Sequence, residues 1–193
     1  MCAQLAPAAP FVEAHKKLRE MVLKLKDVGI QLTDFGMGGG LGIRYSAGED
    51  PPALSDYAAG LKKVLANLPG LTLILEPGRY ASGNSAVMLI EVLYNKVNGD
   101  KNFVVTTGAM NDLIRPSLYG SHHDIRPVKE TSAEKIVVDV VGPICESSDF
   151  LAKDRSLPKV KAGDFLAVMS AGAYGFTMSS NYNSRPRAAQ VLV

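Results

Sequence analysis

Two short motifs carry residues suited to binding an anion. The run Gly38-Gly39-Gly40-Leu41-Gly42 follows a predicted strand, and its backbone N–H groups could surround one phosphate because glycine has no Cβ in the way. The turn Glu76-Pro77-Gly78-Arg79 follows the apolar run 71–75 and places a carboxylate and a guanidinium at the end of a strand. The carboxyl ends of parallel strands share one rim of a sheet, so both motifs are expected there. A flexible loop and an Arg–Glu pair closing a turn are the purely structural alternatives.

Three further groups contain side chains that could contact a substrate. Arg115 and Tyr119 are four residues apart and could reach one carboxylate if their segment is helical. Cys145 precedes Glu146, and a neighbouring carboxylate raises the pKa of a thiol, so a proton donor suits Cys145 better than a nucleophile. A buried inert cysteine is the alternative. Tyr174 lies between glycines and could project from an open loop.

Helical and extended patterns alternate in the first half of the chain. Apolar residues at three- and four-residue spacing predict helices over residues 10–28 and 53–67, the first ended by Gly29 and the second by Pro69-Gly70. Strands are predicted over residues 30–35 and 71–75, and the continuous apolar run of the second is typical of a buried parallel strand. This order indicates an α/β layer with parallel strands.

The second half is predicted to be rich in β-structure. Residues 87–97 and 102–107 form a predicted hairpin around Asn98-Gly99-Asp100. Further strands are predicted over residues 136–141, 164–169 and 188–193. The change of pattern predicts an α/β domain over residues 1–82 and a β-rich domain over residues 83–193. With only two strand–helix steps, the α/β part looks incomplete as an independent domain.

Composition narrows the class of protein. The chain has 193 residues, 47% hydrophobic and 21% charged, as in a globular protein, and its net charge of +2 does not suggest a nucleic-acid partner. No apolar run is long enough for a bilayer, and charges in the first twenty residues exclude a signal peptide. The two cysteines, Cys2 and Cys145, fit a reducing cytoplasm. The adjacent His122 and His123 make a poor metal pair, and no metal site is predicted.

Taken together and in order, several segments resemble the diaminopimelate decarboxylases, pyridoxal-phosphate enzymes that make lysine from meso-diaminopimelate. The segments are GGGLGI, EPGR, MNDLIRPSLYGSHHDI, VVGPICESSDFLA and GDFLAVMSAGAYGFTMSSNYNSRPRAAQVLV, and the resemblance extends over residues 10–193. It implies the C-terminal part of a pyridoxal-phosphate-binding (β/α) barrel followed by a β-rich domain. It also implies a homodimer in which the CESSD segment completes the active site of the partner subunit.

The resemblance implies a role for each candidate residue. It assigns the cofactor phosphate to Gly39, Gly40 and the turn Glu76-Pro77-Gly78-Arg79, and the substrate carboxylates to Arg79, Arg115 and Tyr119. Cys145 corresponds to the proton donor, Glu146 to the contact with the distal amino-acid centre, and Tyr174 to a contact with both cofactor and substrate. Related ornithine decarboxylases have Asp after the cysteine, so Glu146 favours diaminopimelate.

The chain also departs from the family. None of its lysines stands in the Tyr-Ala-x-Lys-Ala-Asn type of context of the Schiff-base lysine, and Cys2-Ala3-Gln4 occupies the approach to a missing His-Gly-Ser motif. We therefore expect a C-terminal fragment or the product of a truncated gene, which by itself is inactive, binds the cofactor weakly and is poorly soluble. Two alternatives remain, a decarboxylase for ornithine, arginine or another diamino acid, and a non-catalytic module that dimerises with a full-length homologue.

Overall fold

The computed structural model describes residues 9–66, 68 and 70–193, and the chain divides into two compact units. The first, here the α/β unit, extends up to Arg44 and includes Gly48–Ala81. The second, the sheet unit, consists of Tyr45–Ala47 and Ser82–Val193. The segment Cys2-Ala3-Gln4 and residues Asn67 and Pro69, to which the sequence patterns assigned features, lie outside the described residues.

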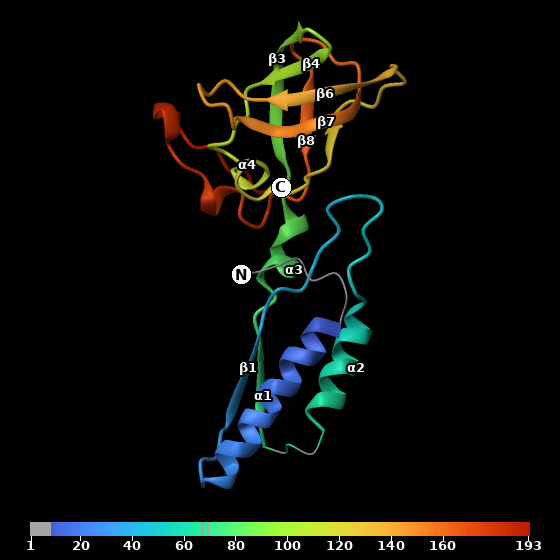
Figure 1. The fold of residues 1–193 in the computed structure, drawn as a ribbon. Coiled ribbons are helices and arrows are strands. Elements are labelled where there is room, and N and C mark those ends of the chain that lie inside the picture. The colour runs from blue at the N-terminus through green and yellow to red at the C-terminus, as the bar shows by residue number, and fades with distance from the viewer. Residues whose placement is uncertain (1–8, 67, 69) are drawn as a thin grey trace. The chain divides into compact units, whose positions relative to one another are not determined.

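The α/β unit contains the two predicted helices and the predicted pair of parallel strands, together with a third, short helix. Its elements are α1 (Ala9–Asp27), β1 (Asp34–Gly38), α2 (Leu54–Val64), β2 (Thr72–Leu75) and α3 (Gly78–Ser82), the last of which ends where the sheet unit begins. Helices α1 and α2 pack side by side (Figure 1). Their apolar faces bury a small core against β1 and the loop that follows it, formed by Val22, Phe35, Met37, Leu41, Tyr57 and Leu61. The hydrophobic period of the two helices therefore produces this packing.

One boundary of the α/β prediction is wrong, and the apolar run of β2 is uncovered. The first strand begins at Asp34 rather than at residue 30, because Gly29 adopts φ +82° and the Ile30 N–H turns back to the Leu25 carbonyl at 2.9 Å. Leu73, Ile74 and Leu75 of β2 are all exposed, as expected for an apolar run of this kind in an incomplete α/β layer. A sheet of only two strands has too little structure packed on it to bury the apolar run.

The sheet unit is built on six strands. These are β3 (Met88–Asn98), β4 (Lys101–Thr106), β5 (Ile125–Pro127), β6 (Lys135–Val141), β7 (Phe150–Pro158) and β8 (Phe165–Val168), in the spatial order β5-β8-β3-β4-β6-β7. The pair β4 and β6 is parallel and every other pair of this sheet is antiparallel. The predicted hairpin is confirmed as β3 and β4, with Gly99 at φ +61° in its turn.

The six strands curve around one apolar core, which makes the sheet nearly closed (Figure 1). Its most deeply buried side chains include Ile90, Val92, Leu113, Val138, Val140, Leu151, Leu166 and Val168. Arg155 of β7 links the two edge strands, because its Nη1 donates to the His123 carbonyl at 2.8 Å and lies 3.9 Å from an Asp124 oxygen, both just before β5. The expected order of an α/β part followed by a β-rich part is confirmed.

Three features of the sheet unit differ from the prediction or were not predicted. Residues 188–193 form no strand, because Val191, Leu192 and Val193 are exposed and have no neighbouring strand to pair with. Strand β5 is too short to give a pattern, and the charged residues 153–155 interrupt the apolar alternation in β7, so neither strand was predicted.

No helix in the described part of the chain is long and apolar enough to cross a membrane.

Candidate functional site

The two glycine-containing motifs meet at one end of the parallel strand pair in the α/β unit. Gly38 ends β1, Glu76 follows β2, and the Glu76 N–H donates to the Gly38 carbonyl at 3.0 Å. A Cβ on Gly39 would lie 2.2 Å from the Glu76 carbonyl oxygen, and Gly40 adopts φ +94°. Only glycine fits either position without strain. The two loops therefore form a close-packed backbone surface, the kind of surface that can approach a phosphate.

The turn after Glu76 uses one of its amides internally. The Gly78 N–H donates to the Glu76 carbonyl at 2.9 Å, and α3 starts at Gly78. Arg79 in this short helix is buried. Because the Gly78 amide already has an acceptor, a phosphate at this rim would depend mainly on the Gly39 and Gly40 amides.

In the sheet unit, Arg115 lies at the centre of a group of aromatic side chains. Arg115 is the first residue of α4 (Arg115–Tyr119) and is only 6% exposed. Its Nη1 donates to the Tyr45 hydroxyl at 2.9 Å and lies 3.0 Å from His123 Nε2. The guanidinium carbon is 5.0 Å from the centroid of the Tyr45 ring and 5.7 Å from that of Tyr174. The site therefore contains a buried cation close to two tyrosine rings.

His123 beside Arg115 is held in its neutral form. Burial, and to a smaller extent the nearby charge of Arg115, lowers the pKa of His123 to about 4. The Met169 carbonyl oxygen, 2.9 Å from Nδ1, acts in the opposite direction but does not offset burial. At neutral pH the side chain is thus an uncharged acceptor for Arg115.

Tyr174 and Tyr119 occupy different surroundings. Tyr174 is half-buried at φ +62°, in a tight loop where a Cβ on Gly172 would lie 1.9 Å from the Ser82 carbonyl oxygen. Tyr119 is 64% exposed at the end of α4, which Gly120 terminates in the left-handed conformation. The segment is helical, as the four-residue spacing required, but no hydrogen bond among the described residues joins Tyr119 to Arg115.

The loop that carries Cys145 and Glu146 is fixed by one buried carboxylate. Asp149 Oδ2 accepts the Ile144 N–H at 2.7 Å, and Oδ1 accepts the Met110 N–H at 2.8 Å. The Ser117 hydroxyl of α4 donates to the Ser148 carbonyl, which joins this loop to the helix of Arg115. The Cys145 thiol is free and exposed, so the alternative of a buried inert cysteine is wrong. An exposed thiol on a loop fixed by these hydrogen bonds is suited to donating a proton to a bound molecule.

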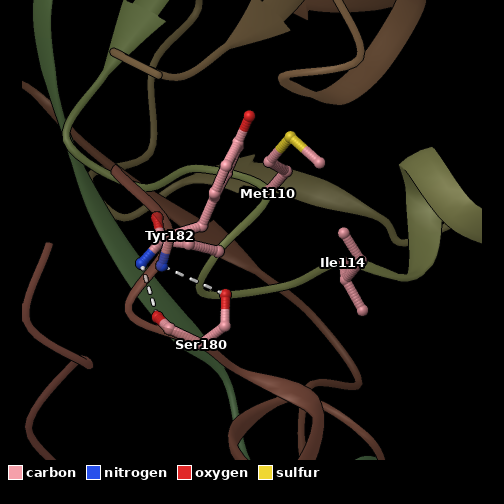
Figure 2. Close-up of a pocket in the computed structure, with 5 residues that line it drawn as sticks. Met110, Ile114, Ser180 and Tyr182 are labelled. Carbon is pink, nitrogen blue, oxygen red and sulfur yellow. Dashed lines mark hydrogen bonds between the residues drawn. The ribbon is translucent and has the colours of Figure 1, made fainter. Parts of the chain in front are cut away.

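Glu146 pairs with a tyrosine beside an open hollow. The Tyr182 hydroxyl donates to Glu146 Oε2 at 3.3 Å, and this bond, together with the charge of Glu146, raises the pKa of Tyr182. Figure 2 shows Met110, Ile114, Ser180 and Tyr182 around the hollow, which has a volume of about 360 Å³ and is also lined by Asn111. No group of three or more His, Cys, Asp or Glu side chains in the described residues is placed to hold a metal ion.

Four residues of these clusters were not singled out as functional from the sequence. Tyr45 and His123 contact Arg115 from 70 and 8 positions away, and a contact of this range leaves no periodic signal. Tyr182 reaches Glu146 across 36 positions in the same way. Asp149 is part of the CESSD motif. Its position at the end of a short loop before a strand was the only sign in the sequence that it fixes this loop.

The two units define a protein of the α/β-plus-β class, with a glycine-lined loop in one unit and a buried arginine in the other. Residues 19–172 match the family model described as pyridoxal-dependent decarboxylase, C-terminal sheet domain. The chain therefore belongs to the family of pyridoxal-dependent decarboxylases.

Individual relatives carry a more specific name. The chain is 46% identical over 191 residues to a diaminopimelate decarboxylase of Aquifex aeolicus and 48% identical over 192 residues to one of Haemophilus influenzae, in each case over 99% of this chain. It is also similar to the crystal structure of diaminopimelate decarboxylase from Helicobacter pylori complexed with L-lysine, with a TM-score of 0.89 and 43% identity over 96% of this chain and 45% of that one. The chain spans 45% and 46% of the length of the two curated relatives.

Proposed function

We propose that the chain is part of a diaminopimelate decarboxylase, a pyridoxal-phosphate-dependent carboxy-lyase that converts meso-2,6-diaminopimelate to L-lysine and CO₂. The observation that carries this proposal is Arg115, a buried guanidinium whose hydrogen bonds go to the neutral Tyr45 and His123. Such a group is suited to binding a carboxylate. The helix that starts at Arg115 is bonded to the loop of Cys145 and Glu146, which fixes the position of that loop within the subunit.

The proposal includes the domain division and assembly. Residues 1–82 form the C-terminal part of a (β/α) barrel, and residues 83–193 form the β-rich domain. The exposed apolar residues of β2 support the first assignment, because further barrel strands and helices would cover them. The protein acts in the cytoplasm as a homodimer, and the CESSD loop of each subunit, with its exposed Cys145 and Glu146, serves the active site of the other.

The residues of the α/β unit fit a phosphate-bearing cofactor. Gly39 and Gly40 would hold the phosphate with backbone amides, and the turn from Glu76 through Pro77 and Gly78 to Arg79 would border it. The close approach of Gly39 to the Glu76 carbonyl leaves no room for a side chain, as a phosphate cradle requires. When bound, pyridoxal phosphate supplies an electron sink for the charge left behind as CO₂ departs. Tyr174, in its tight loop, would contact the cofactor and the substrate.

Four side chains of the sheet unit, and Arg79 of the α/β unit, would bind the substrate and act on it. Arg115, with Arg79 and Tyr119, would bind the carboxylate groups, while the Glu146 carboxylate would bind the distal ammonium. Cys145 would give its Sγ proton to the α-carbon, which is a general-acid step. A longer carboxylate side chain at position 146 is what favours diaminopimelate over ornithine as the substrate.

A chimeric enzyme provides the test. The chimera replaces the matching 191 residues of the Aquifex aeolicus relative with this chain. We expect it to bind pyridoxal phosphate and to form lysine, and we expect Cys145→Ala to lower turnover by about 10²–10⁴-fold with cofactor binding unchanged. Equal turnover by the Cys145→Ala variant would remove the proton-donor role. The 193-residue chain alone is the control, and no CO₂ release is expected from it because it lacks a lysine in the Schiff-base context.

A further inference from the structure

Arg115 is a buried cation without an anionic partner among the described residues. Both of its hydrogen bonds go to neutral groups, the Tyr45 hydroxyl at 2.9 Å and His123 Nε2 at 3.0 Å, and no ion pair within the described part of the chain includes it. A buried charge without a counter-charge is strongly unfavourable. The compensating negative charge is therefore expected to come from a ligand.

The orientation of the His123 ring determines which nitrogen faces Arg115 as an acceptor. Nδ1 lies 2.9 Å from the Met169 carbonyl oxygen, which can only accept, so Nδ1 carries the proton. Nε2 then presents its lone pair to Arg115 Nη1 at 3.0 Å. The charged and titratable groups around the ring are Arg115, Arg155 and His122, and each of them opposes a positive charge on it. The ring also packs edge-on against Tyr45, with centroids 5.3 Å apart.

These contacts divide the guanidinium into an occupied side and an available side. Nη1 has two hydrogens, and its two acceptors use both of them. No hydrogen bond among the described residues starts from Nε or Nη2 of Arg115, so this edge keeps two parallel N–H donors. Such an edge matches the two oxygens of a carboxylate in a bidentate pair.

We propose that His123, as the neutral Nδ1–H tautomer, and Tyr45 are positioning residues that hold Arg115 by Nη1, so that its Nε–Nη2 edge receives the carboxylate of an amino-acid ligand. The ligand class rests on the proposed function, whereas the contacts that hold Arg115 lie entirely within the sheet unit. Neutral acceptors are essential in this arrangement, because a carboxylate in either position would supply the negative charge that the ligand is meant to bring.

Two nearly isosteric variants, made in the chimera that contains this chain, separate this role from simple packing. His123→Gln keeps a neutral acceptor, whereas His123→Glu places a carboxylate beside Arg115. L-lysine is titrated into each protein and the Arg115 Nε–H signal is followed by NMR. Lysine binding by His123→Gln is expected within about threefold of the wild type, and binding by His123→Glu is expected to be weaker by about tenfold or more. Lysinamide, which lacks the carboxylate, should shift the signal in neither protein.

Several results would overturn the inference. Equal lysine affinities of the Gln and Glu variants, or no response of the Arg115 signal to lysine in the wild type, would each contradict it. So would ring ¹⁵N shifts that place the His123 proton on Nε2. If His123→Glu does not fold, Tyr45→Phe takes its place, and unchanged lysine affinity there counts against the proposal. A chimera without turnover, combined with the expected NMR results, would instead refute the proposed function alone.

Discussion

Replacing Asp149 by asparagine tests whether one buried carboxylate sets the conformation of the loop that carries Cys145. In the wild type, Oδ1 accepts the Met110 N–H at 2.8 Å and Oδ2 accepts the Ile144 N–H at 2.7 Å. Asparagine is the same size but has only one acceptor oxygen. Its amide group would face one of the two backbone N–H groups, donor against donor.

The expected loss of stability in Asp149→Asn follows from these two hydrogen bonds. A hydrogen bond to a charged acceptor contributes about 1.5–3 kcal/mol, and a buried donor left without an acceptor costs a further 1–3 kcal/mol, roughly. Because one bond survives in weakened form, we expect Asp149→Asn to lower the free energy of unfolding of the sheet unit by about 2–4 kcal/mol. In a domain of this size, that corresponds to a fall in Tm on the order of 10 °C.

Thermal unfolding combined with amide hydrogen exchange measures both the cost and its location. Protection of the Ile144 and Met110 amides should fall in Asp149→Asn more than protection in β3. Asp154→Asn is the matched control, because Asp154 is exposed, lies 3.5 Å from Lys101 and already has φ +49°, which asparagine tolerates. We expect its effect to stay below about 0.5 kcal/mol. Equal Tm values for the two variants would refute the positioning role of Asp149.

Three further predictions concern the rest of the fold. Gly39→Ala should weaken pyridoxal-phosphate binding by the chimera by about tenfold, as followed by absorbance, since its Cβ would meet the Glu76 carbonyl oxygen at 2.2 Å. Gly48→Ala, in the exposed loop before α2 with nothing within 4 Å of its Cβ, should bind normally. Arg155→Met removes the hydrogen bond to the His123 carbonyl and should lower the free energy of unfolding of the sheet unit by about 1–3 kcal/mol in a urea titration. Arg126 is exposed, so Arg126→Met should lower it by less than about 0.5 kcal/mol. The pKa of His123 is about 4 in the folded state and 6.5 when exposed, so the unfolded state binds the extra proton between these values. Stability should therefore fall by up to about 3 kcal/mol as the pH drops from about 6.5 to 4, and His123→Gln should remove this dependence.

The elements with a strong repeating pattern could be predicted from the sequence. The period of apolar residues located α1 and α2, and the turn around Gly99 located the hairpin of β3 and β4. The start of β1 could not be predicted, because the turn at Gly29 extends the end of α1 into residue 30. The absence of a strand at residues 188–193 could not be predicted either, because a strand depends on a neighbouring strand to pair with. Strand β7 was missed for a related reason, since charged residues break its alternation while its backbone pairs with β6.

The residues with charged or reactive side chains were easier to predict from the sequence than the residues that position them by hydrogen bonds. Arg115, Cys145 and Glu146 stand out by type and spacing, because a cation, a thiol and a carboxylate are reactive wherever they occur. Their supports, such as Tyr45 for Arg115 and Tyr182 for Glu146, are ordinary residues that become important only through contacts across 70 and 36 positions. Such contacts arise from tertiary packing, so one sequence without its fold does not reveal them.

The most direct test of the central claim compares two substrates in the chimera that joins this chain to the Aquifex aeolicus relative. CO₂ release is measured from meso-diaminopimelate and from L-ornithine at equal concentrations with added pyridoxal phosphate. A site built from Arg115 and Glu146 predicts release from diaminopimelate, together with lysine, and release from ornithine that is slower on the order of 10²-fold or more, since ornithine lacks the second carboxylate. Faster release from ornithine, or none from diaminopimelate by folded, cofactor-bound chimera, would contradict the account.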